Sequence, residues 1–369
     1  MDNPADEDWR VLLSLLPDNW EQLAPQLRAV ERHRGFGTTE SVFRTLLLHV
    51  GKGFSLRETA VQAKLAGLAA VSDVTILNRL RQAEDWWRLL CQLLLEESGV
   101  PLPDGPRGRR VRLLDGTLIK EPGRTGSLWR IHYSVRIPSL ICDHLELTPT
   151  RGKGTAEILH RFPAAPGDLV LADRGFCTPI GIEILQQQGA DVIVRWRSTS
   201  LPVYAPQGER LDLLARLRTL QADQVGAWPV RVPGQKQPIA GRLCAVRKSE
   251  ASARKALRKI KRKAQQGGSD PKPETLEFAH YVIVFTTLPA VEFNDSEVLE
   301  WYRIRWQIEL VFKRLKSLAR LGQLPKYNAA SSRAWLYGKL LIALLAQKLI
   351  RVGRTTSPWG YLLSAASQR

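Results

Sequence analysis

The first hundred residues space their apolar side chains three and four residues apart, as amphipathic helices do. Three such segments, separated by glycine-containing joints, cover residues 41–51, 55–67 and 72–97. Ser55 and Glu58 have the spacing of a capping box, and Ser72 or Asp73 can cap the next helix. The pattern predicts a helical N-terminal domain over residues 1–100.

Short helices with tight joints fit two interpretations. One is a helix-turn-helix unit, which places a helix in the major groove of DNA. The other is an ordinary small helical bundle. In the first interpretation the DNA-facing side chains would be Arg57, Lys64, Arg79 and Arg81. Residues 101–110, rich in Pro, Gly and Arg, predict a linker.

Beyond residue 110 the apolar spacing changes to that of strands. Strand-like runs cover residues 111–119, 129–137, 141–147, 168–172 and 191–196. Helices are expected over 155–161 and 179–188. The order β-β-β-α-β-α-β predicts an α/β fold, with helices packed on a mixed sheet, and residues 111–197 form the first part of this core.

Residues 198–285 interrupt the core with β-segments and one very basic helix. Between Arg247 and Lys263 there are nine Lys or Arg residues and one acid, Glu250. Such a helix is either a charged surface exposed to water or a surface that contacts phosphates, and the net charge favours the second. A strand over 281–287 ends this β-rich insertion.

The core resumes in residues 286–325, where Asp295 or Ser296 is expected to cap a long helix. Residues 326–369 predict a C-terminal helical region. Its apolar stretch, 336–350, is too short and too charged for a membrane span, so a buried helix is expected.

Residues 302–316 have two distinct faces if they form one helix. At about 100° per residue, Arg305, Glu309 and Lys316 fall within about 60° of Tyr302. A separate apolar stripe consists of Ile304, Ile308, Val311, Leu315 and Leu318. One carboxylate among cations fits either a salt-bridge cluster or a metal ligand beside a phosphate chain.

The charge of the chain favours a polyanionic partner. The 54 Lys and Arg residues exceed the 36 Asp and Glu residues, which gives a net charge of +18. Nucleic acid is the usual partner of such an excess, ahead of a merely solubilising basic surface.

Four distant cysteines without a C-x-x-C pair signal neither a zinc ribbon nor a redox motif. With no apolar signal core at the N-terminus, a cytoplasmic protein without membrane contact is expected.

Two aspartates occupy unusual positions in predicted strands. Asp115 lies within the apolar run 113–117, and Asp173 directly follows the strand 168–172. A buried carboxylate must be paired, hydrogen-bonded or bound to metal, because a bare one is very costly. Each also has a simpler explanation, since Asp173 could cap the next turn and Asp115 could pair with an arginine.

Together with Glu309, the two aspartates match a ribonuclease-H-like arrangement. The first and fourth strands of that core lie side by side, so Asp115 and Asp173 can meet. Three convergent carboxylates can hold two divalent cations about 4 Å apart. One cation activates a water or a 3′-hydroxyl, and the other stabilises the leaving oxygen. Carboxylate oxygens favour Mg²⁺ or Mn²⁺ over zinc or copper.

The chain resembles the DDE transposases of the insertion-sequence-four family over nearly its whole length. That family carries Y-x2-R-x3-E-x6-K around its last glutamate, and the matching residues here are Tyr302, Arg305, Glu309 and Lys316. The family's first aspartate, in a D-G-T/S context, matches Asp115. Its second, in D-R-G/E-x, matches Asp173-Arg174-Gly175-Phe176. A β-rich insertion before the glutamate is also characteristic of the family.

This resemblance implies a cut-and-paste transposase that acts on double-stranded DNA. Asp115, Asp173 and Glu309 would be its catalytic residues and would bind two Mg²⁺, for which Mn²⁺ can substitute. The enzyme would hydrolyse the DNA at the terminal inverted repeats, form and reopen a hairpin, and join the 3′-hydroxyls to target DNA. A homodimer is expected in the synaptic complex. A catalytically silent DNA-binding relative and a ribonuclease-H-like nuclease are the alternatives.

The resemblance also implies which residues contact DNA. The expected phosphate contacts are Tyr302, Arg305, Lys316, Lys313 and Arg174. We interpret the basic neighbours of Glu309 as a clamp on the phosphate chain and not as its salt-bridge partners. Related enzymes stack a flipped base on an aromatic side chain. Trp228 and Trp196 are the candidates for that role, and each could equally be a core residue.

Overall fold

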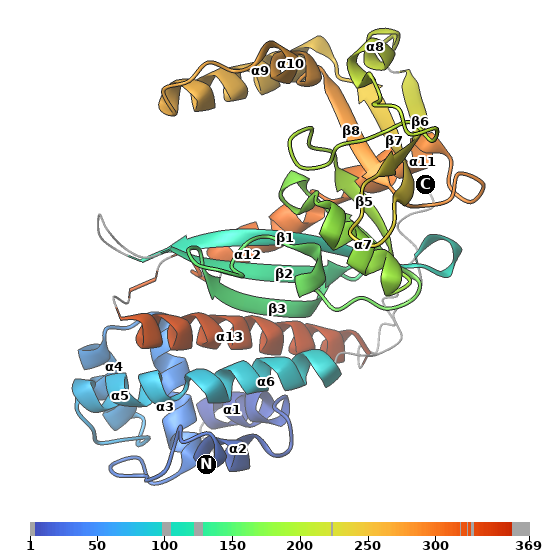
Figure 1. Ribbon diagram of the computed structural model, residues 1–369. Helices are drawn as coiled ribbons and strands as arrows, with labels where there is room; N and C mark the ends of the chain where they lie inside the picture. Colours follow the sequence, from blue (N-terminus) through green and yellow to red (C-terminus); the bar gives the residue numbers. More distant parts are fainter. Residues whose placement is uncertain are drawn as a thin grey trace.

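The computed structural model describes residues 4–97, 105–121, 128–222, 224–317, 319–322, 324–325 and 328–355. From bottom to top, Figure 1 shows the N-terminal helices, a long C-terminal helix, a mixed sheet and a projecting basic helix. Several predicted regions fall partly outside the described residues. These are residues 98–104 of the N-terminal domain and linker, Leu318 of the apolar stripe, and residues 356–369 of the C-terminal region.

The N-terminal part of the chain is helical, as its periodicity predicts. Its helices are α1 (Pro4–Ser14), α2 (Trp20–Gln26), α3 (Thr39–Lys52), α4 (Leu56–Leu65), α5 (Asp73–Gln82) and α6 (Glu84–Glu97). The caps predicted at Ser55 and Ser72 are present, because each side chain accepts a backbone N–H three residues further on. The single segment predicted over 72–97 is wrong, since the chain breaks at Ala83 between α5 and α6.

The sheet contains β1 (Arg110–Lys120), β2 (Leu128–Arg136), β3 (Ile141–Pro149), β4 (Asp168–Ala172), β5 (Asp191–Arg195), β6 (Val225–Val232), β7 (Ile239–Arg247) and β8 (Tyr281–Thr286). Their order is β3-β2-β1-β4-β5-β8-β7-β6. β1 pairs with β4, and β4 with β5, in parallel, whereas the other neighbours are antiparallel. The predicted adjacency of the first and fourth strands is therefore confirmed.

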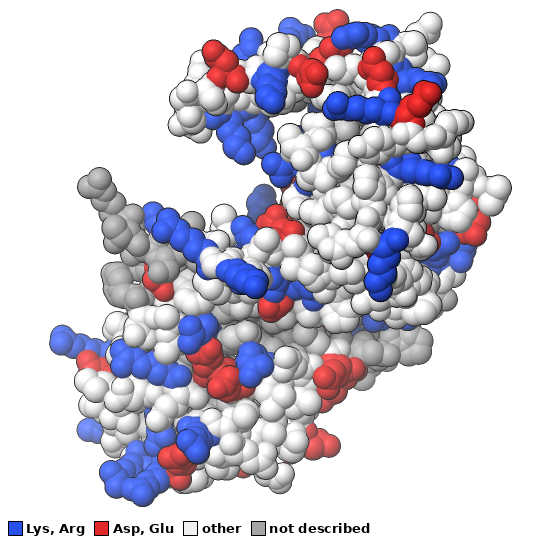
Figure 2. Space-filling view, in the orientation of Figure 1, with Lys and Arg blue, Asp and Glu red and all other residues white. Residues whose placement is uncertain are grey.

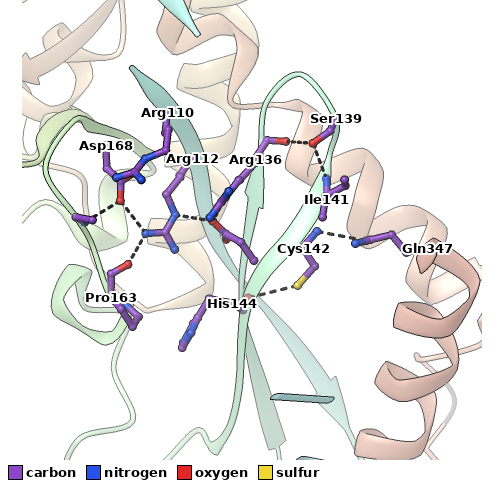
Figure 3. Close-up of polar contacts among 12 residues, drawn as sticks. Arg110, Arg112, Arg136, Ser139, Ile141, Cys142, His144, Pro163, Asp168 and Gln347 are labelled. Atoms are coloured by element: carbon purple, nitrogen blue, oxygen red, sulfur yellow. Dashed lines mark hydrogen bonds and ion pairs between the residues drawn. The ribbon is translucent and has the colours of Figure 1, made fainter. Parts of the chain in front are cut away.

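An ion-pair network fixes the register of β1 against its neighbours (Figure 3). The buried Arg112 side chain pairs with Asp143 on β3 at 2.8 Å and with Asp168 on β4 at 3.3 Å. Arg110 also pairs with Asp168, at 2.9 Å. A shift of β1 along β4 would leave these charges buried without partners, which is costly. The network therefore fixes the alignment of β1 with β4, and with it the position of Asp115 relative to Asp173.

Two segments connect the core strands on the face opposite the N-terminal helices. α7 (Pro179–Gln187) packs against β5 and confirms the helix predicted over 179–188. The helix predicted over 155–161 is wrong, because only a 3₁₀ turn, η2 (Leu159–Arg161), is present. Arg130 on β2 donates to the Thr155 carbonyl at 2.9 Å, and this tertiary contact holds the segment before η2 out of a helix.

Residues 198–285 extend the same sheet and add an arm to it. β7 pairs with β8, which in turn pairs with β5 of the core. This region also holds α8 (Leu213–Arg218), α9 (Glu250–Gln266) and α10 (Pro273–Phe278). α9 is the predicted basic helix, and Ala253 is its one buried residue. Figure 1 shows α9 extending away from the sheet.

The long helix predicted around Glu309 is two helices. α11 (Asp295–Ile304) and α12 (Gln307–Ser317) are separated at Arg305 and Trp306. The start of α11 also differs from the prediction, because Asn294 is its cap and forms a full capping box with Glu297. An asparagine carbonyl oxygen serves as a cap as well as the predicted Asp or Ser would.

The last described helix, α13 (Ala329–Thr355), lies between the sheet and the N-terminal helices (Figure 1). It packs against α3, α5 and α6 on one side and against β3 on the other. Gly338 allows a close approach, since a Cβ there would overlap the Trp87 ring. Buried residues of all these elements belong to one hydrophobic core. No helix among the described residues is long and apolar enough to cross a membrane.

Candidate active site

Asp115 and Asp173 lie next to each other where the parallel pairing of β1 with β4 ends. The paired register of β1 and β4 ends at Leu114 opposite Ala172, and each aspartate is the next residue on its strand. Neighbouring strands are about 4.8 Å apart, so the two carboxylates share one edge of the sheet. The structure therefore brings together the two aspartates that are 58 positions apart in the sequence.

The Asp115 carboxylate lies in an environment that disfavours its charge. Burial, together with the nearby charge of Asp173, raises the pKa of Asp115 to about 6. A hydrogen bond from the Gly116 N–H, at 2.7 Å, and the charge of Arg305 oppose this rise in pKa. A bound cation would offset the unfavourable negative charge on Asp115, as it does for carboxylates at metal sites.

Arg305 occupies the space between Asp115 and Glu309. Its Nη1 lies 3.6 Å from Asp115 Oδ2, and its Nη2 donates to Glu309 Oε1 at 2.8 Å. The prediction that the basic neighbours of Glu309 are not its salt-bridge partners is therefore wrong for Arg305. Glu309 is 61% exposed and interacts with Asp115 only through this arginine. No three acidic, histidine or cysteine groups in the described part of the chain are placed to hold a metal ion together.

The break between α11 and α12 places Tyr302 and Arg305 over the aspartates. Backbone hydrogen bonds at this junction span three residues, from Arg305 N to Tyr302 O and from Glu309 N to Trp306 O. The Tyr302 hydroxyl donates to Asp173 Oδ1 at 3.5 Å. Burial, together with the charge of Asp173, raises the pKa of Tyr302 to about 12, so the phenol keeps its proton.

The other predicted phosphate contacts are exposed side chains. Lys313 and Lys316 are exposed on α12, and Arg174 is exposed immediately after Asp173.

A cleft of about 770 Å³ opens beside Asp173 and extends to α9. Asp173, Tyr302 and Arg305 line one end, and Lys259 and Lys263 of α9 line the other. Figure 2 shows this hollow beneath α9, with basic side chains on the side of the helix that faces it.

Half-buried cations line the middle of the cleft. Burial lowers the pKa of Arg195 to about 10, and burial with the charges of Arg195 and Arg174 lowers the pKa of Lys248 to about 8. The Lys248 ammonium donates to the Ala279 carbonyl at 2.7 Å. Asp173 is the one acid among the residues that line the cleft. A phosphate chain would neutralise this excess of positive charge.

The tryptophans predicted to stack on a base differ in their surroundings. Trp196 lines the cleft, but it is 7% exposed, and its ring packs edge-on against Phe278. Trp228 packs against the core on the α7 side of the sheet.

Trp306, which no sequence motif singles out, is 52% exposed at the junction of α11 and α12. Its signal is an aromatic residue placed off the apolar stripe, between Arg305 and Glu309. Glu157 lies in a loop without a motif. Its carboxylate lies close to the backbone that follows each aspartate.

Comparison with known proteins identifies the family. Residues 149–345, more than half of the chain, match the family described as "Transposase DDE domain". This chain belongs to the DDE transposases. The match includes Asp173 and Glu309. Enzymes of this family cut and rejoin DNA and generally use divalent metal ions.

Two relatives align with this transposase along most of its length, and a third along about half of it. One is the "Putative transposase InsL for insertion sequence element IS186A" of Escherichia coli (strain K12), 34% identical over 95% of both chains. Another is the "Transposase for insertion sequence element IS421" of Escherichia coli, 33% identical over 95% of both chains. The "Transposase for insertion sequence element IS231F" of Bacillus thuringiensis subsp. israelensis is 27% identical over 49% of this chain and 41% of its own.

Proposed function

We propose that this transposase mobilises an insertion sequence of the insertion-sequence-four family. It cuts the element's ends by metal-dependent hydrolysis, proceeds through a hairpin, and joins the 3′-hydroxyls to target DNA. The observation that carries this proposal is the placement of Asp115 and Asp173 at one edge of β1 and β4, beneath Tyr302 and Arg305. The Escherichia coli relatives, named as insertion-sequence transposases, support it.

Asp115, Asp173 and Glu309 are the residues that would hold two Mg²⁺ or Mn²⁺ ions. The donor set fits, since carboxylate oxygens suit these hard cations and the raised pKa of Asp115 reflects a need for positive charge. When bound, such ions activate the attacking hydroxyl and stabilise the leaving oxygen. Arg305 can exchange its carboxylate partners for a DNA phosphate, which would free Glu309 for this role.

The protein's own groups would hold the DNA strand in the cleft. Tyr302 and Arg305 lie closest to Asp173, and Arg174, Arg195 and Lys248 continue the positive surface toward α9. Lys313 and Lys316 would contact phosphates further along the strand. Trp306, exposed beside Arg305, is a better candidate for stacking on a flipped base than the buried Trp196 or the core-packed Trp228.

We further propose a functional division of the chain. Residues 1–100 would be a DNA-binding domain, joined by a linker at 101–110. Residues 111–197 and 286–325 would form a ribonuclease-H-like core, and the strand order β3-β2-β1-β4-β5 supports this. Residues 198–285 would be the β-rich insertion and 326–369 a C-terminal helical region. The enzyme would act as a homodimer that pairs two DNA ends in the bacterial cytoplasm.

The test is cleavage of a labelled DNA end from the inverted repeats that flank the coding sequence. Asp115→Asn, Asp173→Asn and Glu309→Gln should each abolish cleavage in Mg²⁺ while the protein still binds the end in a gel-shift assay. Glu300→Gln is the matched control, because it removes an exposed acid from α11 and should cleave normally.

Three results would contradict parts of the proposal. Cleavage by any of the three acid variants would remove that residue from the site. Cutting without transfer of the 3′-hydroxyl to a target plasmid would indicate a nuclease. Binding without cleavage in Mg²⁺ or Mn²⁺ would indicate a silent DNA-binding relative.

A further inference from the structure

The basic helix α9 presents cations on two opposite sides. On this helix, the residues that line the cleft beside Asp173 are Ala256, Lys259, Ile260 and Lys263. At about 100° per residue, Arg254, Arg258 and Lys261 lie within about 60° of one another and about 180° from the middle of the cleft-lining set. These three exposed residues form what we call the outer face of α9. Figure 2 shows basic side chains on the upper side of this arm as well as beneath it.

The cations of α9 crowd one another without acidic partners. Glu250, its one acid, begins the helix. The described part of the chain offers no ion-pair partner to any Lys or Arg of α9. Arg254 and Arg258 are four residues apart, a spacing at which like charges destabilise a helix. A surface that served solubility alone would mix acids among the bases, whereas a bound polyanion would relieve this repulsion.

The outer face suits the charge density of double-stranded DNA. Arg254 and Lys261 are seven residues apart, which is about 10 Å along the helix. A duplex carries one phosphate charge per about 1.7 Å of its axis, so several phosphates come within reach of three long side chains. α9 extends away from the sheet, and Ala253 is its one buried residue (Figure 1). A duplex can therefore approach the outer face from solvent.

We propose that the outer face of α9 binds target DNA while the transposon end occupies the cleft. This inference rests on the proposed function, because joining a 3′-hydroxyl to a target requires two DNA molecules near one set of acids. α9 forms a wall of the cleft and is about 10 Å thick, so a duplex on its outer face lies beside the strand inside without competing for the same cations. Phosphate contacts carry no sequence information, so this surface would accept targets of varied sequence.

The experiment measures a second duplex binding to full-length protein that is saturated with an unlabelled transposon end. The second duplex is labelled and lacks the inverted repeat. Fluorescence anisotropy at a series of salt concentrations gives the slope of log affinity against log salt. The outer-face variant combines Arg254→Gln, Arg258→Gln and Lys261→Gln. It should reduce the magnitude of this slope by about 3, one for each lost phosphate contact, and weaken binding by about 10-fold or more.

Two controls separate the outer face from net charge and from the cleft. The first removes the same charge from exposed positions of the insertion outside α9, and it combines Arg210→Gln, Arg231→Gln and Lys236→Gln. Its salt slope should change by less than about 1. The second, a cleft variant, combines Lys259→Gln with Lys263→Gln. It should weaken binding of the transposon end and leave the salt slope of the second duplex nearly unchanged.

Strand transfer and end cleavage complete the test. The outer-face variant should cut the transposon end at the normal rate and lose most transfer into a target plasmid. An unchanged salt slope in this variant would overturn the inference, and normal end cleavage beside it would leave the proposed function standing. A loss of end cleavage as large as in the cleft variant would also overturn the inference, because both sides of α9 would then hold one DNA segment. If the unmodified protein cuts no ends, the proposed function fails, and a reduced salt slope would still support a duplex site on the outer face.

Discussion

Replacing Asp115 by Asn should make the metal-free transposase more stable. The carboxylate is mostly buried on β1, and the chain must keep it charged without a bound cation. An asparagine of nearly the same shape removes the charge and still accepts the Gly116 N–H through its side-chain oxygen. A residue proposed to bind metal would then be a residue that weakens the metal-free fold.

The size of this effect follows from the pKa of Asp115. The pKa rises from an ordinary 3.8 to about 6. One unit corresponds to 1.36 kcal/mol, so ionisation of Asp115 costs the folded state about 3 kcal/mol above pH 6. Because the folded-state pKa is raised, this cost is fully present above that pKa and disappears as the pH falls toward 3.8. The advantage of Asp115→Asn should be about 3 kcal/mol at pH 8 and about 1 kcal/mol at pH 4.5.

Urea unfolding in EDTA, followed by circular dichroism at both pH values, measures this difference. Glu300→Gln removes an exposed charge of the same sign and should change stability by less than about 0.5 kcal/mol. Adding Mn²⁺ should stabilise the unmodified protein and leave Asp115→Asn unaffected. The reasoning is refuted if Asp115→Asn is no more stable than the unmodified protein at pH 8, or if its advantage does not shrink at pH 4.5.

Three other perturbations have defined outcomes. Because the pKa of Lys248 is about 8, DNA affinity measured by fluorescence anisotropy should fall between pH 7 and 9. Lys248→Arg should make DNA affinity less dependent on pH. The same pH dependence in this variant and in the unmodified protein would contradict the prediction. Trp306→Ala should leave urea stability within about 0.5 kcal/mol, since the ring is half exposed, but reduce hairpin product relative to nicked ends on a denaturing gel. Asp168→Ala should destabilise the protein by about 3 kcal/mol in urea, because Arg112 loses a buried partner, and a loss below about 1 kcal/mol would contradict the role of the network.

The sheet was largely predictable because its signal is local and repeated. Each core strand is a short apolar run, and the adjacency of β1 and β4 places Asp115 beside Asp173 once the strands are recognised. The helix expected over 155–161 failed for a tertiary reason. Arg130, on a strand distant in sequence, takes the Thr155 carbonyl, and local helix propensity does not include such a contact.

The arrangement around Glu309 was only partly predictable. The apolar positions Ile304 and Ile308 continue with helical spacing across the break at Arg305, so the pattern contains no sign of two helices. The four-residue spacing of Arg305 and Glu309 also suits a salt bridge, and the structure contains this pair across the break between α11 and α12. Charge spacing alone does not determine whether an arginine binds a phosphate or its neighbouring acid.

The position of α13 has a consequence for how the chain assembles during synthesis. Its residues are made after the N-terminal helices and the strands, yet it separates and supports both. Until α13 emerges from the ribosome, Trp87 on α6 lacks the surface around Gly338 that covers it, and Glu84 lacks its partner Arg333. Chains that stop before residue 329 would therefore expose apolar surface on two elements at once and would be substrates for proteases. The core thus closes only after α13 has been made.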